Sequence, residues 1–377
     1  MLYKKLNLIS EAGNSFYYSE NQLQEIYKEL EEFLEKANNL NNLHFAKKML
    51  FSYEIKANNQ VEGYGDDFLL IEKIIKQKEQ EIKDINARKR IINLYRGYQY
   101  ILENHNFSQD SLKELYDILS NGLLDEYDLT HFGKFYRLAP VYILRCGRLD
   151  NTLDEGIDYQ KIPDLIDKYF QFLTSSYLEG DMVAAYIKSQ ILHFYFVYIH
   201  PYFDVNGRTS RTMSLWYLLD KEAYPFIIFN RGISFKGSKY DKVISDAKKS
   251  FNITSFLNLM LLTVKTELEK EYIIQNIASN IDNKLRGMDY QTLLYFLTMN
   301  GVKTVKDFTF FYNSFNDKKK ALDIYKEMIM PLIEMDVFNV ERYTKRFINN
   351  ELPNMVLKIN PGKIDLDKNI IKRVKIK

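Results

Sequence analysis

The sequence predicts a mainly α-helical protein, and two observations lead to this fold class. Glycine and proline are sparse, with 15 and 7 residues among 377. Long stretches of the chain also place apolar residues at helical spacing. Hydrophobic residues make up 46% and charged residues 27% of the chain, as in a globular protein with a large core. The length favours two to three domains of about 150 residues each.

The first 100 residues or so read as helical, and residues 21–36 show the pattern most clearly. Leu23, Ile26 and Leu30 recur there every three or four residues, on one face of a helix. Asp181 is the expected N-cap of a later helix. The helices predicted before the C-terminal quarter span residues 21–36, 43–57, 67–83, 108–124, 162–178, 182–199, 211–220, 239–250 and 254–274.

One segment in this helical part is expected to be extended. Residues 135–144 are rich in β-branched and aromatic side chains and include Pro140, which disfavours helix. We expect a short β-hairpin or flap at this position.

The C-terminal quarter differs in pattern and in charge. Helices over residues 290–299 and 318–335, followed by strands over 337–342 and 355–359, match a winged helix-turn-helix. From Ile281 onward the net charge is +6, whereas the first 280 residues carry −4. Lysines 318–320 and the basic tail at 372–375 could therefore meet DNA phosphates. The alternative is a small packing domain with solvated lysines.

The single cysteine and the lack of a signal-peptide pattern predict a cytoplasmic protein. Cys146 is the one cysteine, which excludes an intrachain disulfide and a Cys-x-x-Cys zinc site. The first residues lack the apolar stretch of a signal peptide, and no run of about eighteen apolar residues predicts a membrane span. No membrane partner is expected. The sequence also lacks a Gly-x-x-x-x-Gly-Lys-(Ser/Thr) loop and a Rossmann glycine fingerprint.

Residues 200–211, His-Pro-Tyr-Phe-Asp-Val-Asn-Gly-Arg-Thr-Ser-Arg, form a turn between two apolar helical runs. Gly207 lets a backbone approach a ligand closely, and amides at a helix start favour anions. Arg208 and Arg211 lie three residues apart, so within a helix they can grip one phosphate chain.

The same segment supplies a base and a metal ligand. His200 can accept a proton near neutral pH. Asp204 is a hard oxygen ligand suited to Mg²⁺ that also touches phosphate. Together these residues predict phosphoryl or nucleotidyl transfer. The alternative is a structural loop in which Asn206 caps the helix and both arginines are solvated.

This string resembles the signature of the Fic family, His-Pro-Phe-x-(Asp/Glu)-Gly-Asn-Gly-Arg-x-x-Arg, whose members mostly transfer AMP from ATP to protein hydroxyls. Around it, 184–199 resembles the helix before the signature, and Tyr136-Arg137 followed by Val141 resembles the target-binding flap. The resemblance covers about residues 40–275. It implies a Fic-type helical bundle with a short β-hairpin flap.

The three parts expected from this resemblance and the C-terminal pattern are an N-terminal helical region (1–100), a Fic catalytic core (101–280) and a winged-helix-like domain (281–377).

The resemblance implies a role for each matching residue. His200 would be the base, Asp204 the Mg²⁺ ligand, and Arg211 the partner of the γ-phosphate of ATP. Val141 would face a target segment that pairs with the flap. The residues implied to lie around the nucleotide are Val205, Asn206, Gly207, Arg208, Arg211 and Tyr240.

A second motif implies self-inhibition. Residues 58–63, Asn-Asn-Gln-Val-Glu-Gly, resemble the inhibitory motif (Ser/Thr)-x-x-x-Glu-(Gly/Asn), with Asn58 in place of the hydroxyl residue. Glu62 would pair with Arg211 and block productive ATP geometry. The implied function is a self-inhibited AMP transferase with ATP as substrate, Mg²⁺ as cofactor and a Ser, Thr or Tyr hydroxyl as acceptor. The alternative is an exposed glutamate at a helix end.

Three departures from the family pattern bear on the nucleotide. Val205 replaces the first signature glycine, and a β-branched residue is poorly suited to positive φ. Tyr202 replaces phenylalanine. Asp241 and Lys248 fall where the family often has a second tyrosine and an asparagine near the adenine, which leaves the nucleotide preference open.

Two other functions stay open on the sequence. One is a nucleotide-binding adaptor or DNA-binding protein with a weak Fic site, which Val205 and the basic C-terminus favour. The other is the reverse reaction, in which Glu62 activates water to remove AMP. The target protein, with the chain itself as one candidate, is left open. So is the formation of a homodimer, which is frequent in the family.

Overall fold

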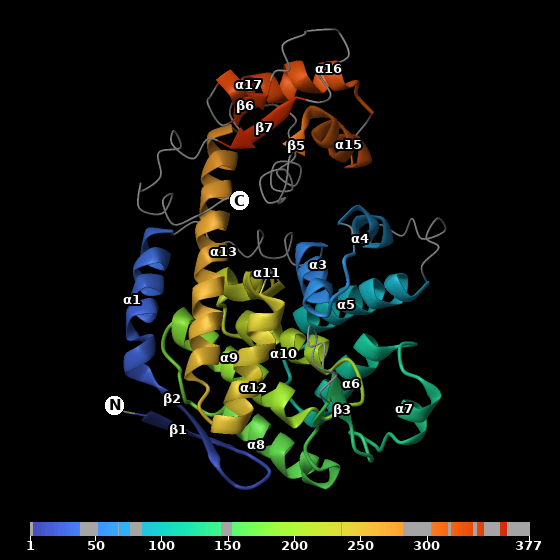
Figure 1. Ribbon diagram of the computed structural model, residues 1–377, viewed down its shortest axis with the longest axis vertical. Coiled ribbons are helices and arrows are strands. Elements are labelled where there is room, and N and C mark those ends of the chain that lie inside the picture. The colour runs from blue at the N-terminus through green and yellow to red at the C-terminus, as the bar shows by residue number, and fades with distance from the viewer. Residues whose placement is uncertain are drawn as a thin grey trace. The chain divides into compact units, whose positions relative to one another are not determined.

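The computed structural model describes residues 3–37, 52–66, 68–75, 85–144, 153–234, 236–281, 303–315, 318–334, 338–342 and 355–359. The chain forms two compact units, Met1–Glu267 and Leu268–Lys377, each with most of its residue contacts inside the unit. Helices predominate (Figure 1), as the composition predicts. This division does not separate residues 1–100 from residues 101–267, so the three-part organisation stays a prediction.

The first unit is a helical bundle with two small β-hairpins. Its helices are α1 (Glu20–Lys36), α3 (Ser52–Val61), α4 (Phe68–Ile75), α5 (Ile85–Glu103), α6 (Gln109–Ser120), α7 (Glu126–Thr130), α8 (Ile162–Thr174), α9 (Met182–Ile199), α10 (Asn206–Asp220), α11 (Phe229–Ser234), α12 (Gly237–Ser250) and α13 (Thr254–Ile281), which continues into the second unit. Of two 3₁₀ turns, η3 (Tyr159–Lys161) directly precedes α8 and η4 (Tyr224–Ile228) links α10 to α11.

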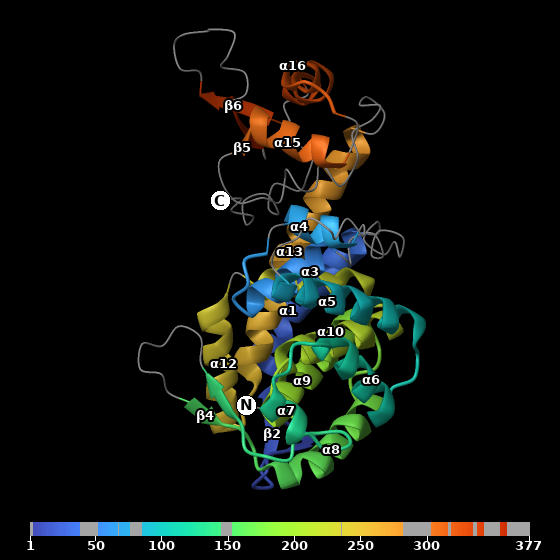
Figure 2. The ribbon, with the colours of Figure 1, turned by 90° about the vertical axis from the view of Figure 1, so that its right-hand side faces the viewer.

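Helices α9 and α10 form the centre of the bundle, as Figures 1 and 2 both show. Almost every residue of α9 is buried, because its apolar side chains cover the whole circumference rather than one stripe. Helix α10 packs against α9, α5, α6 and α3. It begins at Asn206, five residues before the predicted start. Arg208 and Arg211 therefore belong to one helix.

The N-terminal residues correct the prediction that the first 100 residues are helical. They begin with an antiparallel hairpin of β1 (Tyr3–Ile9) and β2 (Ser15–Ser19). Leu6 and Leu8 are buried and their neighbours are exposed, a period of two that marks a strand. Gly13 has a φ of +83° and supplies the left-handed turn. The pattern is short, and the helix that follows conceals it.

The flap is shorter than the extended segment that we expected. Strand β3 (Tyr142–Leu144) pairs antiparallel with β4 (Leu153–Glu155). Residues 135–140 instead form turns, with a single bridge between Phe132 and Arg137. The Arg137 side chain is fully buried, and its bonds to backbone carbonyls, described below, hold this irregular course.

The second unit contains a three-stranded antiparallel sheet in the order β5-β7-β6. The predicted strands are present as β6 (Phe338–Arg342) and β7 (Val356–Ile359). The described elements before them are β5 (Lys303–Thr304), α15 (Val305–Phe315), α16 (Ala321–Ile324), a π-helical turn η5 (Tyr325–Ile329) and α17 (Met330–Glu334). The winged helix stays a prediction.

Helix α15 was not anticipated, because its aromatic residues resemble those of a strand. Its start does carry a helix signal, since Thr304 Oγ1 accepts the amide hydrogen of Asp307 at 3.2 Å and Asp307 Oδ2 accepts that of Thr304 at 2.8 Å. The helix predicted over 290–299 and the basic tail at 372–375 lie outside the described residues.

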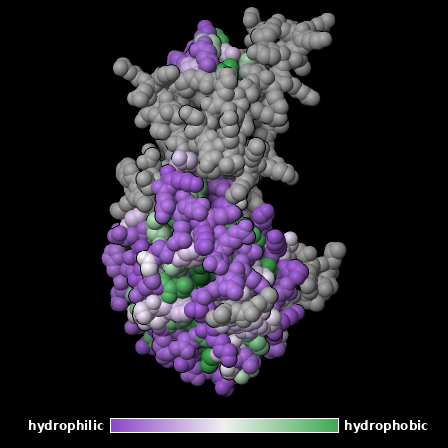
Figure 3. All heavy atoms as spheres, turned by 90° about the vertical axis from the view of Figure 1, so that its left-hand side faces the viewer, coloured by the Kyte–Doolittle hydropathy of each residue, from purple (hydrophilic) through white to green (hydrophobic). Residues whose placement is uncertain are grey.

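One face of the first unit is largely polar (Figure 3). The face in Figure 3 is mostly hydrophilic, with apolar residues gathered in one small area near its middle. Among the helices that the structure describes, we find none with the length and apolar character needed to cross a bilayer.

The N-cap of α9 gives a first testable prediction. Asp181 Oδ1 accepts the amide hydrogens of Val183 and Ala184 at 2.7 and 2.9 Å, as expected for this cap, and Oδ2 accepts the Tyr27 hydroxyl. We expect Asp181→Ala to lower the free energy of unfolding by about 1–2 kcal/mol in urea titrations. Asp181→Ser, which keeps a capping oxygen, should lose much less. Equal stability of Asp181→Ala and wild type would contradict this assignment.

Candidate active site

The loop of residues 200–205 joins α9 to α10 and has a left-handed residue at each end. His200, the C-cap of α9, has a φ of 49°, and Val205, directly before α10, has a φ of 67°. This conformation costs a residue with a Cβ about 1–2 kcal/mol. Val205 is 2% exposed, so burial of its side chain offsets part of the cost. The departure found in the sequence therefore lies at a position that favours glycine.

Asn206 closes this loop with its side chain. Its Oδ1 accepts the amide hydrogen of Tyr202 at 3.0 Å, and its Nδ2 donates to the Tyr202 carbonyl at 2.8 Å. The Tyr202 ring stacks on Tyr116 with centroids 3.6 Å apart, which fixes the loop to the core. Asn206 is the first residue of α10 and not its cap, so the structural alternative given for this residue is wrong. Its side chain is used within the loop, and its backbone amide is what it can offer a ligand.

His200 is held in the neutral form. Burial lowers the pKa of its imidazole to about 3, and the charges of Lys248 and Arg137 add to this effect. The ring is therefore unprotonated at pH 7, the form that can accept a proton from a hydroxyl. The backbone carbonyl of His200 accepts a hydrogen bond from Arg137 Nε at 3.0 Å.

The first turn of α10 offers donors to an anion. Its backbone amides, from Asn206 onward, have no carbonyl partner within the helix and carry partial positive charge. Arg208 is 4% exposed, and its Nε and Nη1 have no hydrogen-bond partner in the described part of the chain. Its Nη2 lies 3.8 Å from Asp204 Oδ2. A buried guanidinium with unused donors indicates a place for an anionic ligand.

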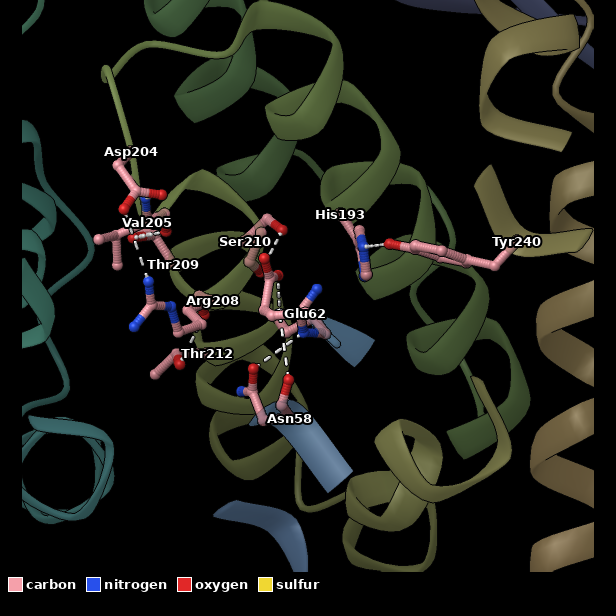
Figure 4. Close-up of polar contacts among 12 residues, drawn as sticks. Asn58, Glu62, His193, Asp204, Val205, Arg208, Thr209, Ser210, Thr212 and Tyr240 are labelled. Carbon is pink, nitrogen blue, oxygen red and sulfur yellow. Dashed lines mark hydrogen bonds and ion pairs between the residues drawn. The ribbon is translucent and has the colours of Figure 1, made fainter. Parts of the chain in front are cut away.

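Arg211 lies one turn further along α10 and is fully buried. Its Nη2 forms an ion pair with Glu62 Oε1, and its Nε donates to Asn58 Oδ1 at 3.0 Å. Burial alone would raise the pKa of the Glu62 carboxyl, but the charge and hydrogen bond of Arg211 outweigh it, and the pKa lies below its ordinary value. Glu62 is therefore ionised at neutral pH. Figure 4 shows Asn58 and Glu62 reaching α10 from α3.

Gly207 is the residue on which the Glu62 carboxylate rests. A Cβ built at Gly207 would clash with Glu62 Oε1 and lie 3.0 Å from Arg211 Nη1. Glycine is therefore needed here for a negatively charged group to approach the start of α10. The Glu62 side chain is 31% exposed, so this position opens toward solvent.

Tyr240 and His193 lie on the other side of this cluster from Asp204 and Arg208 in the view of Figure 4. The two residues are buried, and the Tyr240 hydroxyl is hydrogen-bonded to His193 Nε2 at 2.5 Å. Burial, followed by the charge of Arg211, lowers the pKa of His193 to about 3. A neutral, hydrogen-bonded histidine inside the core agrees with a packing residue rather than a metal ligand.

The structure places the remaining predicted residues at the edges of the site. Asp204 is exposed, and its Oδ1 accepts the amide hydrogen of Val205 at 2.6 Å. Val141 precedes β3, and its carbonyl accepts the amide hydrogen of Gly156 at 2.8 Å, which closes the base of the flap. Thus Glu62, Gly207 and Arg211 are in direct contact, whereas His200 and Val141 lie at the loop and the flap.

Sequence reasoning missed Glu54 and Arg231, which dock α3, the helix that directly precedes Glu62. Glu54 is fully buried on α3, and its Oε1 accepts a hydrogen bond from Arg231 Nε of α11 at 2.9 Å. Glu54 and Asn58 lie four residues apart on one face of α3, and Glu62, four residues later, lies in the turn directly after this helix. That spacing of polar residues could have indicated a buried polar face.

A comparison with known protein families identifies the domain that contains most of these residues. The Fic/DOC family model matches residues 106–218, from just before α6 to the end of α10. The chain carries a Fic/DOC domain. The matched region contains the flap and residues 200–211, and it leaves out α3 with Glu62.

Solved structures with the same fold extend further along the chain. A Fic family protein from Desulfovibrio desulfuricans G20 is 17% identical, with a TM-score of 0.54 over 90% of this chain and 95% of that chain. A structure of Fic-1 from C. elegans is 14% identical, with a TM-score of 0.52 over 68% of this chain and 73% of that chain. At these identities the likeness shows a Fic fold alone.

The Glu54–Arg231 pair predicts a pH dependence of stability. Burial raises the pKa of Glu54 to about 7 against the opposing effect of Arg231. The folded state therefore binds this proton more tightly than the unfolded state. The resulting stabilisation is complete below pH 4.5 and is lost as the pH rises through 7, by up to about 3 kcal/mol. The difference in unfolding free energy between wild type and Glu54→Gln should thus change between pH 5 and 8.

Glu62→Gln, two turns further along the chain and directly after the same helix, is the matched control. The pKa of Glu62 is lowered, so its contribution is lost only as the pH falls below the ordinary range for a carboxyl. This variant should keep the wild-type dependence between pH 5 and 8. A constant difference between wild type and Glu54→Gln over this range would show that Glu54 does not titrate there.

Proposed function

We propose that the chain transfers AMP from ATP to a hydroxyl of a protein and that Glu62 restrains this reaction. One observation carries the proposal: the Glu62 carboxylate lies against Gly207 and Arg211, at a helix start rich in buried donors. An acidic side chain at this position occupies a site suited to a phosphate. Proteins of the Fic/DOC family typically transfer AMP to proteins, which names the reaction.

The chemistry follows from the residues around this position. The hydroxyl oxygen of the target attacks the α-phosphorus of ATP, and the bond to the oxygen bridging the α- and β-phosphates breaks. The neutral imidazole of His200 takes the hydroxyl proton, and pyrophosphate leaves. The amides of residues 206–208 and the guanidinium of Arg208 stabilise the charge on the phosphates. Arg211 holds the γ-phosphate once Glu62 has moved away.

The residues present fit a magnesium ion. Mg²⁺ in nucleotide sites is held by one or two carboxylates together with phosphates and water, and the Asp204 carboxylate is exposed at the edge of the site. Asp204 would hold the ion, which supplies charge neutralisation for the pyrophosphate leaving group. Tyr240, beside Arg211, would lie toward the nucleoside.

Restraint by Glu62 has a direct electrostatic cause. Arg211 is fully buried, and its Nη2 and Nε already bond to Glu62 and Asn58. A γ-phosphate that approached this side would meet a second negative charge and find these donors engaged. ATP would then bind in a pose that does not align its α-phosphorus with the acceptor hydroxyl.

A nucleotide-binding adaptor is the second candidate function, and Val205 favours it. The buried valine with positive φ adds bulk directly before the phosphate-binding turn. The sheet order β5-β7-β6 with the preceding helices supports a winged helix in the C-terminal unit. We propose DNA as the partner of that unit. A homodimer through the Fic domain is a further proposal.

Autolabelling with ATP that carries the label on its α-phosphate tests the proposed reaction. We expect Glu62→Gly with Mg²⁺ to label itself or an added protein at least tenfold faster than wild type. Adding His200→Ala to that variant should reduce the rate by about 10²- to 10⁴-fold, since a general base contributes that much.

Two controls separate the candidate functions. Nucleotide affinity of the Glu62→Gly, His200→Ala protein should match that of Glu62→Gly, because His200 acts on the acceptor. If a folded Glu62→Gly protein binds ATP and labels nothing, with Val205 replaced by glycine as well, the transferase proposal is wrong. The adaptor then becomes the better account. Loss of AMP from a modified target only when Glu62 is present would instead indicate the reverse reaction.

A further inference from the structure

A single buried arginine joins the flap to the loop that carries His200. Arg137 is fully buried. Its Nε donates to the His200 carbonyl at 3.0 Å, its Nη1 to the Ala139 carbonyl at 2.8 Å, and its Nη2 to the Ile157 carbonyl at 2.7 Å. Its own backbone amide donates to the Pro201 carbonyl at 3.1 Å.

These acceptors lie at three places that the chain must hold together. Ala139 comes just before the first flap strand, and Ile157 just after the second. His200 and Pro201 begin the loop between α9 and α10. One rigid guanidinium with several donors in a plane can fix three backbone segments at once, which a lysine cannot do.

The absence of a side chain at Gly156 leaves room for the Arg137 guanidinium. Gly156 lies at the end of the flap, and a Cβ built there would lie 2.6 Å from Val141 Cγ1 and 3.2 Å from Arg137 Nη2. Burial lowers the pKa of Arg137 to about 10 despite the favourable charges of Asp158 and Glu11. A charged group is therefore kept in the interior at a cost, and apolar packing of the flap does not explain it.

We propose that Arg137 is a positioning residue that holds His200 and the flap in one register. The proposal rests on the proposed transfer reaction, in which the flap presents the target hydroxyl and His200 removes its proton. An error of about 1 Å between these two parts can cost a reaction about 100-fold. Arg137 itself touches neither the nucleotide site nor the acceptor, and it acts through the backbone of residues 139, 157 and 200.

Histidine NMR on the full chain tests this directly, because the sequence holds five histidines. The parent is Glu62→Gly with ¹³C-labelled histidine, and His200→Gln assigns the His200 signal. In the parent, His200 should not titrate between pH 5 and 8. In Arg137→Met, the loss of the anchor should move the His200 signal at pH 7, and the loss of a nearby positive charge should raise its pKa.

Activity supplies the second readout. Arg137→Met should lower kcat for AMP transfer by about 100-fold and leave the KM for ATP within about twofold. The pH below which kcat falls should be higher in this variant than in the parent. Arg137→Lys, which keeps a cation with one reachable carbonyl, should recover part of kcat. Gly156→Ala, which crowds Arg137 without removing it, should lower kcat in the same direction.

Lys188→Met is the matched control for loss of a buried cation. Lys188 is fully buried, and its Nζ donates to the Ser175 carbonyl at the end of α8. We expect this variant to melt at a lower temperature with an unchanged His200 titration. An unchanged His200 signal and kcat in folded Arg137→Met or Gly156→Ala would overturn the proposal.

The two proposals fail in different ways. If the Glu62→Gly parent transfers no AMP, the transferase assignment fails. The His200 signal of Arg137→Met still decides whether Arg137 fixes the loop, because that measurement needs no turnover.

Discussion

The ion pair between Glu62 and the buried Arg211 is the interaction on which the rest of the site depends. Arg211 is inside the protein, where an unpaired charge costs several kcal/mol, so some anion must lie beside it. The protein supplies that anion as Glu62, directly after α3, and in the proposed reaction the γ-phosphate of ATP would take its place. The Glu62 carboxylate lies so close to the start of α10 that a Cβ at Gly207 would clash with it, so we propose that Glu62 and a phosphate compete for this position. In the proposed function, restraint and catalysis use the same guanidinium.

This arrangement explains why α3 docks through polar contacts. Glu54, Asn58 and Glu62 face the core at intervals of one turn, and each meets an arginine: Arg231 for the first and Arg211 for the other two. Polar pairs of this kind fix register more strictly than apolar contacts, and they can separate when a competing charge arrives. A helix held only by leucines would not respond to a phosphate.

Residues 200–211 show which features of the candidate site could be predicted from the sequence. The segment predicted a turn between helices, a base and a phosphate clamp; the structure places residues 200–205 in the loop between α9 and α10, and Arg208 and Arg211 within α10. The left-handed backbone conformation at Val205 could be anticipated, because the family signature has a glycine at this position. The use of Asn206 within the loop could not, because it depends on where Tyr202 packs. Likewise, the three carbonyls that meet Arg137 lie 2, 20 and 63 residues away along the chain, and no local pattern reports such distances.

The secondary structure could likewise be predicted where it depends on consecutive residues, and it was missed where it depends on distant ones. The amphipathic helix α1, the apolar helix α9 and the Asp181 cap are encoded in consecutive residues and were predicted correctly. The N-terminal hairpin was missed because its strands are short and take part of their order from elsewhere. Tyr17 bonds to the backbone at Phe251 and Ile253, far along the chain. Helix α15 was missed because its aromatic content outweighed a capping signal at Thr304.

The competition between Glu62 and the γ-phosphate can be measured directly by calorimetry of nucleotide binding. Affinities for ATP and ADP should be compared in wild type and Glu62→Gly, with Mg²⁺ present. If both anions use Arg211, removing Glu62 should strengthen ATP binding by about tenfold more than ADP binding, a coupling of about 1.4 kcal/mol. An equal change for both nucleotides would show that the γ-phosphate does not replace Glu62 at Arg211, and the account of restraint would be wrong.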